Sequence, residues 1–472
     1  MKNDRLKQHV DFIDEQQINN ILTETKNLPV EKIRAIVTKA REAQGLTPFE
    51  TAVLLQAEDE DILRLMFDAA HEVKEKIYGK RLVLFAPLYI SNYCVNNCVY
   101  CGYRTHNQIT RRRLGFDEIE KEIIALEAMG HKRLALEVGE DPENCPIDYV
   151  LDAIRCIYSV KDKTGSIRRV NVNIAATTVE NYRRLQEAGI GTYILFQETY
   201  HRPTYEKMHP AGPKKDYDWH TTAMDRAMEG GIDDVGLGVL FGLYDFKFEV
   251  LGLLLHSLHL EERFGVGCHT ISVPRIRPAT GIDLVNFPYL VEDDDFKKII
   301  ATIRLAVPYT GMILSTREKA DFRNELIELG ISQLSAGSCT GVGGYHKEIE
   351  KEEPAKTEGQ FQVEDHRTTD EVLYSICQSG YIPSFCTACY RRGRTGDRFM
   401  PLAKSGEIQN LCQPNAILTF KEFLIDYASG ETRDIGENAI KKHLGEIPDP
   451  KVRRETEKRL TRIEQGERDL YL

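Results

Sequence analysis

The chain has 472 residues, which is long enough for a barrel of about 250 residues with flanking segments. Its net charge of -11 argues against a nucleic-acid partner, because phosphates attract Lys and Arg. No apolar run approaches the roughly 20 residues that span a bilayer, and Met1–Val10 is polar and charged. We therefore expect a cytoplasmic protein that uses neither a membrane nor nucleic acid.

Residues 1–80 are predicted to form an N-terminal helical extension. Apolar residues recur at helical spacing over Val30–Ala43 and Asp61–Tyr78, and Thr47-Pro48 is a typical helix start between them.

From Leu82 onward, short apolar runs typical of strands alternate with amphipathic helical stretches. Eight runs occur, at Val83–Ile90, Arg133–Val138, Val170–Ala175, Thr192–Gln197, Asp234–Phe241, Thr270–Pro274, Gly311–Ser315 and Ser332–Ala336. This alternation predicts an α/β fold, a parallel (β/α)8 barrel of the TIM type over residues 81–345. A doubly wound open sheet is the alternative, and the lack of a GxGxxG sequence after the first run argues against it.

Residues 346–472 are predicted to form a mainly helical C-terminal domain. The charged stretch Lys347–Asp365 has the composition of a linker or exposed loop, and a helical pattern begins at Thr369.

Three cysteines follow the first predicted strand, in Cys94-Val-Asn-Asn-Cys98-Val-Tyr-Cys101. Disulfides are rare in a reducing compartment, so these cysteines need another explanation. Three thiolates on one loop can hold three corners of a [4Fe–4S] cluster and leave one iron open to a chelating ligand. A zinc site is the alternative, although zinc prefers four ligands and paired CxxC units.

This spacing, its place after the first strand, and Tyr100 before the last cysteine resemble the radical S-adenosylmethionine superfamily. The resemblance implies that S-adenosylmethionine chelates the open iron and yields a 5′-deoxyadenosyl radical. It also implies cofactor contacts for Tyr100 and for Glu140. The latter ends Glu137-Val-Gly139-Glu140, which is similar to a Gly-Gly-Glu element of the superfamily, although Val138 replaces the first glycine.

Polar residues after other predicted strands complete the candidate site. Glu198 and Thr199 follow the fourth strand and suit the ribose or methionyl part of the cofactor, while Arg202 can pair with a carboxylate. Ser315 and Arg317 follow the seventh strand, and we assign them to the carboxylate of an amino-acid substrate, which a guanidinium fork matches. A purely structural role is the alternative for each of these residues.

A second group of cysteines lies outside the predicted barrel. Cys386 and Cys389 form a CxxC pair, and Cys412 follows after twenty-two intervening residues. A structural zinc site is one explanation, but three cysteines rather than four favour a second iron–sulfur cluster with an exchangeable iron.

The two cysteine groups, the barrel, and the segments Ser272–Pro278 and Ser315–Glu318 together resemble the radical tyrosine lyases that mature [FeFe]-hydrogenase. The resemblance runs along nearly the whole chain. It implies cleavage of the Cα–Cβ bond of L-tyrosine to p-cresol and dehydroglycine. Carbon monoxide and cyanide then form at an auxiliary [4Fe–4S] cluster and build an Fe(CO)2(CN) unit.

The resemblance further implies that the auxiliary cluster carries a labile iron with a bound cysteine molecule, and that His269 holds this iron. His269 begins the sixth predicted strand, so we expect it at the opposite barrel mouth from the first cluster. The implied partners are a low-potential electron donor, such as ferredoxin or flavodoxin, and other hydrogenase maturation proteins. Two alternatives remain: a 2-iminoacetate synthase of thiamine biosynthesis, whose family lacks the second cysteine group, and a non-catalytic iron–sulfur scaffold.

Overall fold

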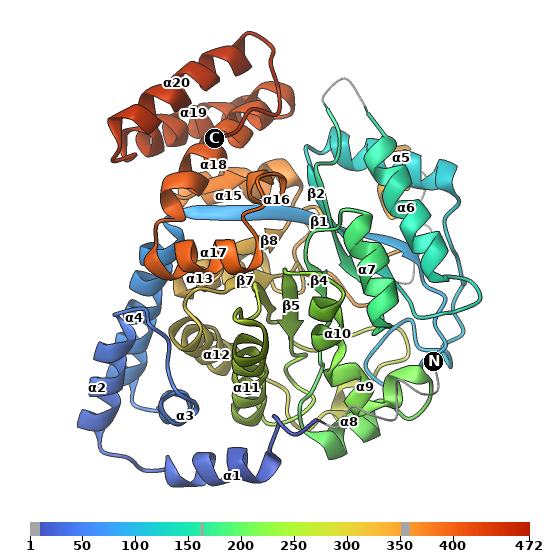
Figure 1. Cartoon of the computed structure of the whole chain (residues 1–472), viewed down its shortest axis with the longest axis vertical. Coiled ribbons are helices and arrows are strands. Elements are labelled where there is room, and N and C mark those ends of the chain that lie inside the picture. The colour runs from blue at the N-terminus through green and yellow to red at the C-terminus, as the bar shows by residue number, and fades with distance from the viewer. Residues whose placement is uncertain (1–9, 162–164, 351–358) are drawn as a thin grey trace.

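The chain folds around a closed barrel of parallel strands (Figure 1). A computed structural model describes residues 10–161, 165–350 and 359–472. The strands follow the order β2-β3-β4-β5-β6-β7-β8-β1, and β1 pairs again with β2 to close the barrel. They are β1 (Arg81–Ser91), β2 (Arg133–Val138), β3 (Arg169–Asn173), β4 (Tyr193–Ile194), β5 (Val235–Gly238), β6 (Thr270–Ser272), β7 (Gly311–Leu314) and β8 (Gln333–Ser335).

All eight predicted strands are present, which confirms the (β/α)8 barrel. Several are shorter than expected, because the ends of the apolar runs continue into loops at the barrel mouths. One strand was not predicted: β9 (Ile382–Ser384) pairs in parallel with Arg81–Val83 at the start of β1. The eleven-residue β1 is long enough to pair with β8 and β9 near its start and with β2 near its end.

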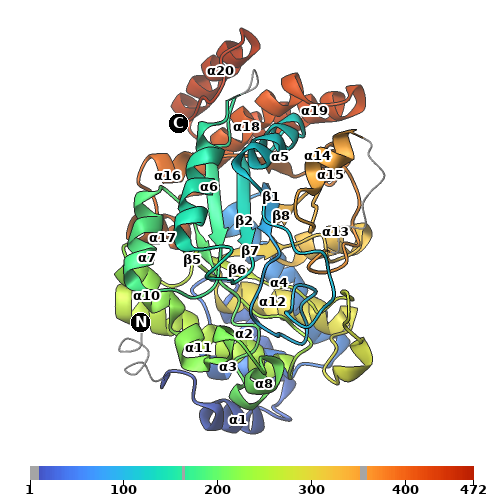
Figure 2. The same cartoon turned by 90° about the vertical axis from the view of Figure 1, so that its right-hand side faces the viewer.

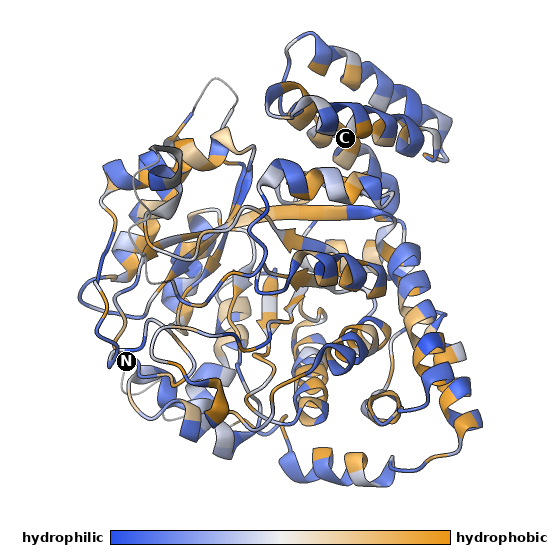
Figure 3. Cartoon of the chain, turned by 180° about the vertical axis from the view of Figure 1, so that it is seen from behind, coloured by the Kyte–Doolittle hydropathy of each residue, from blue (hydrophilic) through white to orange (hydrophobic). Residues whose placement is uncertain are grey.

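Helices of mixed hydropathy surround the barrel, with apolar and polar residues alternating along their ribbons (Figure 3). This pattern suits elements that bury one side and expose the other. The helices between barrel strands include α5 (Phe116–Ala128), α6 (Ile147–Ser159), α7 (Val179–Glu187), α8 (Arg202–Met208), α9 (Tyr217–Thr221), α10 (Ala223–Glu229), α11 (Phe246–Phe264), α12 (Asp293–Ala306) and α13 (Ala320–Leu329). None of the described helices is long and apolar enough to cross a membrane.

The N-terminal helices pack on one side of the barrel. They are α1 (Glu15–Glu24), α2 (Val30–Ala40), α3 (Pro48–Leu55) and α4 (Glu60–Tyr78). The Thr47 hydroxyl accepts a hydrogen bond from the Glu50 amide, and the Glu50 carboxylate accepts one from the Thr47 amide, which caps α3 as the sequence predicts. Contacts of α3 with α11 and α12, and of α4 with α12 and α13, hold this extension in place.

The C-terminal helices are α14 (Gly344–Glu350), α15 (Thr369–Gln378), α16 (Ala388–Arg391), α17 (Gly396–Ser405), α18 (Gln409–Asp426), α19 (Gly430–Gly445) and α20 (Pro450–Glu464). The last three of them, α18 to α20, lie at the end of the molecule opposite α1 (Figures 1 and 2). The region is mainly helical, as expected. The predicted domain limit at 345 falls within α14, and the domain limits stay a prediction.

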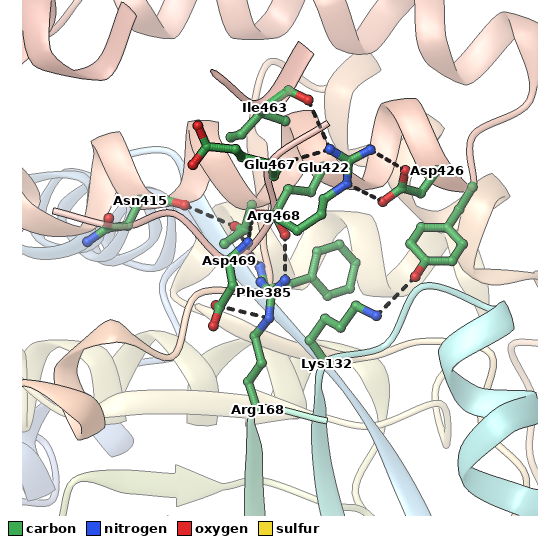
Figure 4. Close-up of polar contacts among 12 residues, drawn as sticks. Lys132, Arg168, Phe385, Asn415, Glu422, Asp426, Ile463, Glu467, Arg468 and Asp469 are labelled. Atoms are coloured by element: carbon green, nitrogen blue, oxygen red, sulfur yellow. Dashed lines mark hydrogen bonds and ion pairs between the residues drawn. The ribbon is translucent and has the colours of Figure 1, made fainter. Parts of the chain in front are cut away.

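Polar contacts join the C-terminal region to the barrel (Figure 4). Arg168, just before β3, forms a buried ion pair with Glu422 of α18 at 2.6 Å, and the same guanidinium lies 3.1 Å from Asp469. Arg468 binds Asp426 through two hydrogen bonds of 2.7 and 2.6 Å. The described chain after α20 therefore bridges α18 and the barrel.

Residues 359–367, which we call the strap, cross the barrel mouth at the C-terminal ends of the strands. Their backbone amides at Gln362 and Glu364 bond to the carbonyls of Pro278 and Thr316, and the amide of Gly102 bonds to the Gln360 carbonyl. Asp365 anchors the strap through a buried ion pair with Arg323 of α13. Burial acts to raise the pKa of Asp365, but Arg367 and Arg323 lower it to about 2 overall.

We predict that Arg323→Ala destabilises the protein by about 3–5 kcal/mol, because it leaves the Asp365 charge buried without this partner. The midpoint of urea unfolding measures the effect. Arg183→Ala is the matched control, since Arg183 pairs with Glu180 where both side chains are at least half exposed. That control should lose less than about 1 kcal/mol. Equal losses in the two variants would contradict the anchoring role.

Candidate active site

The structure brings the first cysteine group together in one cavity at the C-terminal mouth of the barrel. The cavity has an empty volume of about 1100 Å³, part of it open to solvent. Cys98 is buried, while Cys94 and Cys101 are half-buried. The predicted residues that share this lining are Cys94, Cys98, Cys101, Tyr100, Glu140, Glu198 and Arg317.

Asn96 fixes the loop that carries these cysteines. Its side-chain amide donates a hydrogen bond to Glu140 Oε2 at 2.6 Å, and its Oδ1 accepts one from the Lys214 amide at 2.9 Å. Gly139 permits the close approach of the loop, because a Cβ there would lie 2.3 Å from the carbonyl oxygen of Tyr93. Glu140 therefore supports the cysteine loop directly, besides lining the cavity.

The cysteine thiols are in surroundings that disfavour bare thiolates. Burial raises the pKa of Cys94 and Cys98, and raises that of Cys101 to about 11. Among the described residues, no three His, Cys, Asp or Glu side chains are arranged to hold one metal ion. A [4Fe–4S] cluster separates its cysteines more widely than a single ion and supplies positive charge to them, so the three converging thiols and the roomy cavity fit such a cluster.

Glu198 and Lys214 form an ion pair beside the cysteines. Lys214 Nζ lies 2.7 Å from Glu198 Oε1, and Glu198 adopts a left-handed backbone conformation with φ of 70°. Burial acts to lower the pKa of Lys214, but the Glu198 carboxylate raises it above its ordinary value. The Tyr100 hydroxyl lies 2.8 Å from His209 Nε2, which orients that ring at the cavity edge.

Thr199 and Arg202 do not reach this cavity. Thr199 donates a hydrogen bond to the buried carboxylate of Glu249, and Arg202 pairs with Asp218 at 2.7 Å. Glu198 lines the cavity, whereas the next residue, Thr199, turns toward Glu249 of α11 and is not part of the lining. We therefore leave Thr199 and Arg202 out of the proposed site.

Another cavity, which we call the inner cavity, extends from the first cavity into the barrel. Its empty volume is about 680 Å³, and it includes Ser315 and Arg317. The Arg317 guanidinium stacks on Phe361 of the strap, 3.4 Å from the ring centroid. Among the described residues, Arg317 has no ion pair, whereas the neighbouring Arg275 and Arg277 are both paired with Glu318. Arg317 is thus the arginine available to a ligand here.

The second cysteine group surrounds a cavity at the opposite barrel mouth. Cys386 follows β9, Cys389 is on α16 and Cys412 is on α18. They line a cavity of about 600 Å³ of empty volume together with His269, which directly precedes β6. We call this the second cavity. The predicted grouping of His269 with these three cysteines is present, at the mouth expected from its place before the strand.

Positive side chains line the second cavity beside the thiols, among them Arg81 and Arg394. A hydrogen bond with Cys389 and, against burial, the charges of Arg81 and Arg394 lower the pKa of Cys412. The same hydrogen bond, together with burial, raises the pKa of Cys389. Buried sulfur ligands with nearby cations suit a cluster of net negative charge, so these residues fit a second iron–sulfur cluster.

The inner and second cavities lie along one axis. Alternate residues of a barrel strand point inward, so a step of two residues moves along the interior. Such steps lead from the second cavity to the inner cavity on four strands: Val83 to Phe85, Arg133 to Ala135, Gly311 to Ile313, and Gln333 to Ser335. The two cysteine groups therefore lie at opposite ends of one barrel.

Several lining residues were not predicted as part of the site. Glu137 lines both the first and inner cavities, and Gln360 reaches them from the strap. Alternate residues of β2 point into the barrel. This alternation could have indicated Glu137, since it is two residues beyond Ala135. Nothing in the sequence pattern places Lys214 or the strap residues at the site, because they come from segments outside the barrel strands.

Comparison with known proteins places the chain in a family. Residues 88–253 match the radical SAM superfamily, and residues 272–382 match the Biotin and Thiamin Synthesis associated domain. The 2-iminoacetate synthase of Escherichia coli (strain K12) is 31% identical over 356 residues, which cover 75% of this chain and 90% of that protein.

Solved structures give a longer match. A crystal structure of HydG, a maturase of the [FeFe]-hydrogenase, is 63% identical with a TM-score of 0.95, covering 98% of this chain and 100% of that one. The [FeFe]-hydrogenase maturase HydG from Carboxydothermus hydrogenoformans is 40% identical with a TM-score of 0.82, covering 94% and 97%. The chain therefore belongs to the HydG family of hydrogenase maturases, within the radical SAM enzymes.

Proposed function

We propose that this protein cleaves the Cα–Cβ bond of L-tyrosine to p-cresol and dehydroglycine, and converts the smaller fragment to carbon monoxide and cyanide. The observation that carries the proposal is the pair of cysteine-lined cavities at opposite ends of one barrel. The diatomic products would enter an Fe(CO)2(CN) unit for [FeFe]-hydrogenase maturation. Free cysteine, a low-potential donor such as ferredoxin or flavodoxin, and other maturation proteins are the proposed partners.

Cys94, Cys98 and Cys101 would hold the first [4Fe–4S] cluster, which supplies a 5′-deoxyadenosyl radical from S-adenosylmethionine when both are bound. Glu140 and the Glu198–Lys214 pair line the same cavity and present charged groups to the amine and carboxylate of the methionyl part. The polar residues thus orient the cofactor, while Leu195, Phe196 and Leu240 form apolar walls that limit water.

Arg317 would bind the tyrosine carboxylate, and Ser315 would support it. Arg317 lines both the first and inner cavities, and Phe361 holds its guanidinium plane by stacking. The amide of Arg317 donates to the Ser315 hydroxyl at 3.4 Å, so the two residues share one turn. A substrate bound in this way would lie next to the cofactor cavity, as a radical abstraction requires.

At the other mouth, Cys386, Cys389 and Cys412 would hold the auxiliary cluster, and His269 would hold a labile iron. Their common lining of the second cavity supports this assignment. The alternative function is a cleavage reaction that ends at 2-iminoacetate, and the 31% identity to the Escherichia coli enzyme favours it. This alternative gives no catalytic use to a second cavity that is lined by three cysteines and a histidine.

One anaerobic assay tests the proposal. The protein is reconstituted with iron and sulfide and given reductant, S-adenosylmethionine and tyrosine. The proposal requires p-cresol, carbon monoxide and cyanide. Production of p-cresol without carbon monoxide would favour the 2-iminoacetate reaction, and the absence of both p-cresol and 5′-deoxyadenosine would leave only the scaffold.

Arg317→Lys should lower kcat/KM for tyrosine by about 10- to 100-fold, because an ammonium cannot replace the bidentate guanidinium. The rate of p-cresol formation over a range of tyrosine concentrations measures this. Arg184→Lys serves as a control, since Arg184 binds Asp148 on the outer surface. A parental kcat/KM in Arg317→Lys would remove this residue from the substrate site.

Cys386→Ala should keep p-cresol formation within about twofold and lose most carbon monoxide, because only the second cavity loses a ligand. Trapping of carbon monoxide and chromatography of p-cresol provide the two readouts. Cys377→Ala is the matched control, because Cys377 is buried on α15 and does not line the second cavity. Undiminished carbon monoxide from Cys386→Ala would refute the two-site assignment.

Glu137 gives a pH-dependent prediction. Burial raises its pKa from the ordinary 4.5 to about 8, against the Arg317 charge and a hydrogen bond from Asn173. As pH rises from 4.5 to 8, the unfolded chain releases this proton and the folded chain keeps it, so the free energy of unfolding falls. Glu137→Gln should therefore gain stability relative to the parent across this window and level off above it. Urea unfolding at several pH values checks this, and a constant difference would contradict it.

A further inference from the structure

Asp234 lies in the second cavity and has no role in the site described so far. Its side chain is 2% exposed, and neither carboxylate oxygen has a hydrogen-bond partner among the described residues. A buried carboxylate normally has partners, because burial without them is unfavourable. Its nearest basic group is His269, whose Nε2 lies 3.8 Å from Asp234 Oδ2.

The barrel strands fix this pair. Asp234 directly precedes β5 and His269 directly precedes β6, and these strands are neighbours in the barrel. The His269 amide donates to the Val235 carbonyl at 2.9 Å, which sets the two segments side by side. The Phe399 ring packs on the imidazole with a centroid distance of 4.3 Å. The backbone and one aromatic contact thus hold His269 with one ring nitrogen toward Asp234.

This arrangement resembles the outer part of many histidine–metal sites. A metal-bound histidine usually donates its second ring N–H to a carboxylate, a backbone carbonyl or a water, which fixes the tautomer and the ring orientation. Since Nε2 faces Asp234, Nδ1 is the nitrogen that faces away from the carboxylate. The separation of 3.8 Å exceeds a hydrogen bond of about 2.9 Å, so a ring movement of under about 1 Å would close it.

We propose that Asp234 is a positioning residue for His269. It accepts a hydrogen bond from Nε2–H and so presents Nδ1 to the labile iron of the second cavity. The inference rests on the proposed function, in which His269 is the iron ligand. Asp234 acts through the histidine and needs no contact with substrate.

The neighbouring Asp233 supplies a matched control. Its carboxylate accepts a hydrogen bond from the Thr395 hydroxyl at 2.8 Å, and it is not part of the second-cavity lining. Asp233→Asn and Asp234→Asn therefore make the same chemical change at adjacent positions, with only one of them facing His269.

The experiment uses the full chain, reconstituted with iron and sulfide, and titrates it anaerobically with Fe(II). Iron per chain gives the affinity of the labile iron, and the electron paramagnetic resonance spectrum of the reduced enzyme reports its attachment to the auxiliary cluster. We expect Asp234→Asn to weaken Fe(II) binding by about 10- to 100-fold and to reduce the spectral signature of the iron-loaded cluster. Asp233→Asn should match the parent, and Asp234→Glu should bind more iron than Asp234→Asn.

His269→Ala separates the two levels of the proposal. Iron loss in His269→Ala with parental binding in Asp234→Asn would overturn the role of Asp234 and leave the ligand assignment standing. Iron retained in both variants would overturn the assignment of His269 itself. Production of p-cresol at the other barrel mouth reports whether each variant is folded. If Asp234→Asn lowers p-cresol production, the Asp234→Glu variant is used to decide. Iron binding by Asp234→Glu that is no better than that of His269→Ala would then overturn the inference.

Discussion

The pairing of β9 with the first residues of β1 is the contact on which the two-ended arrangement depends. Three residue pairs, from Arg81 with Ile382 to Val83 with Ser384, add a parallel strand at the N-terminal end of the barrel. Cys386 follows two residues after this strand, so the pairing brings the second cysteine group to the mouth where His269 directly precedes β6. The same β1 ends three residues before Cys94. One strand thus connects both cavities.

The barrel could be predicted because its signal is repeated eight times, and both cysteine groups could be predicted because each combines a CxxC pair with a third cysteine. The strand β9 could not. It has only three residues, includes Pro383, and is held by its pairing with β1 rather than by a pattern of its own. Proline is compatible with this position, because β9 is the outermost strand of the sheet.

Position along a strand determines the direction of a side chain only within the strand. Glu198 faces the cavity and Thr199 bonds to Glu249, although both are polar; both lie beyond the end of β4, where the alternation of a strand does not distinguish them. No such rule applies to residues that come from outside the barrel strands, such as Lys214 and Gln360. Asp234 could not be singled out for a different reason. Its sequence context is that of an ordinary strand start, and only the folded structure shows that its buried carboxylate has no hydrogen-bond partner among the described residues.

The length of β1 has a consequence for how this protein can change over generations. Arg81 and Val83 line one cavity, Phe85 and Pro87 the interior, and Tyr89 the other cavity, all by the same parity. Inserting or deleting one residue midway would turn every residue on one side of the change from the lumen to the outer helices. Viable changes in this strand are therefore limited to substitutions, and the two cysteine-lined cavities keep their alignment with one another.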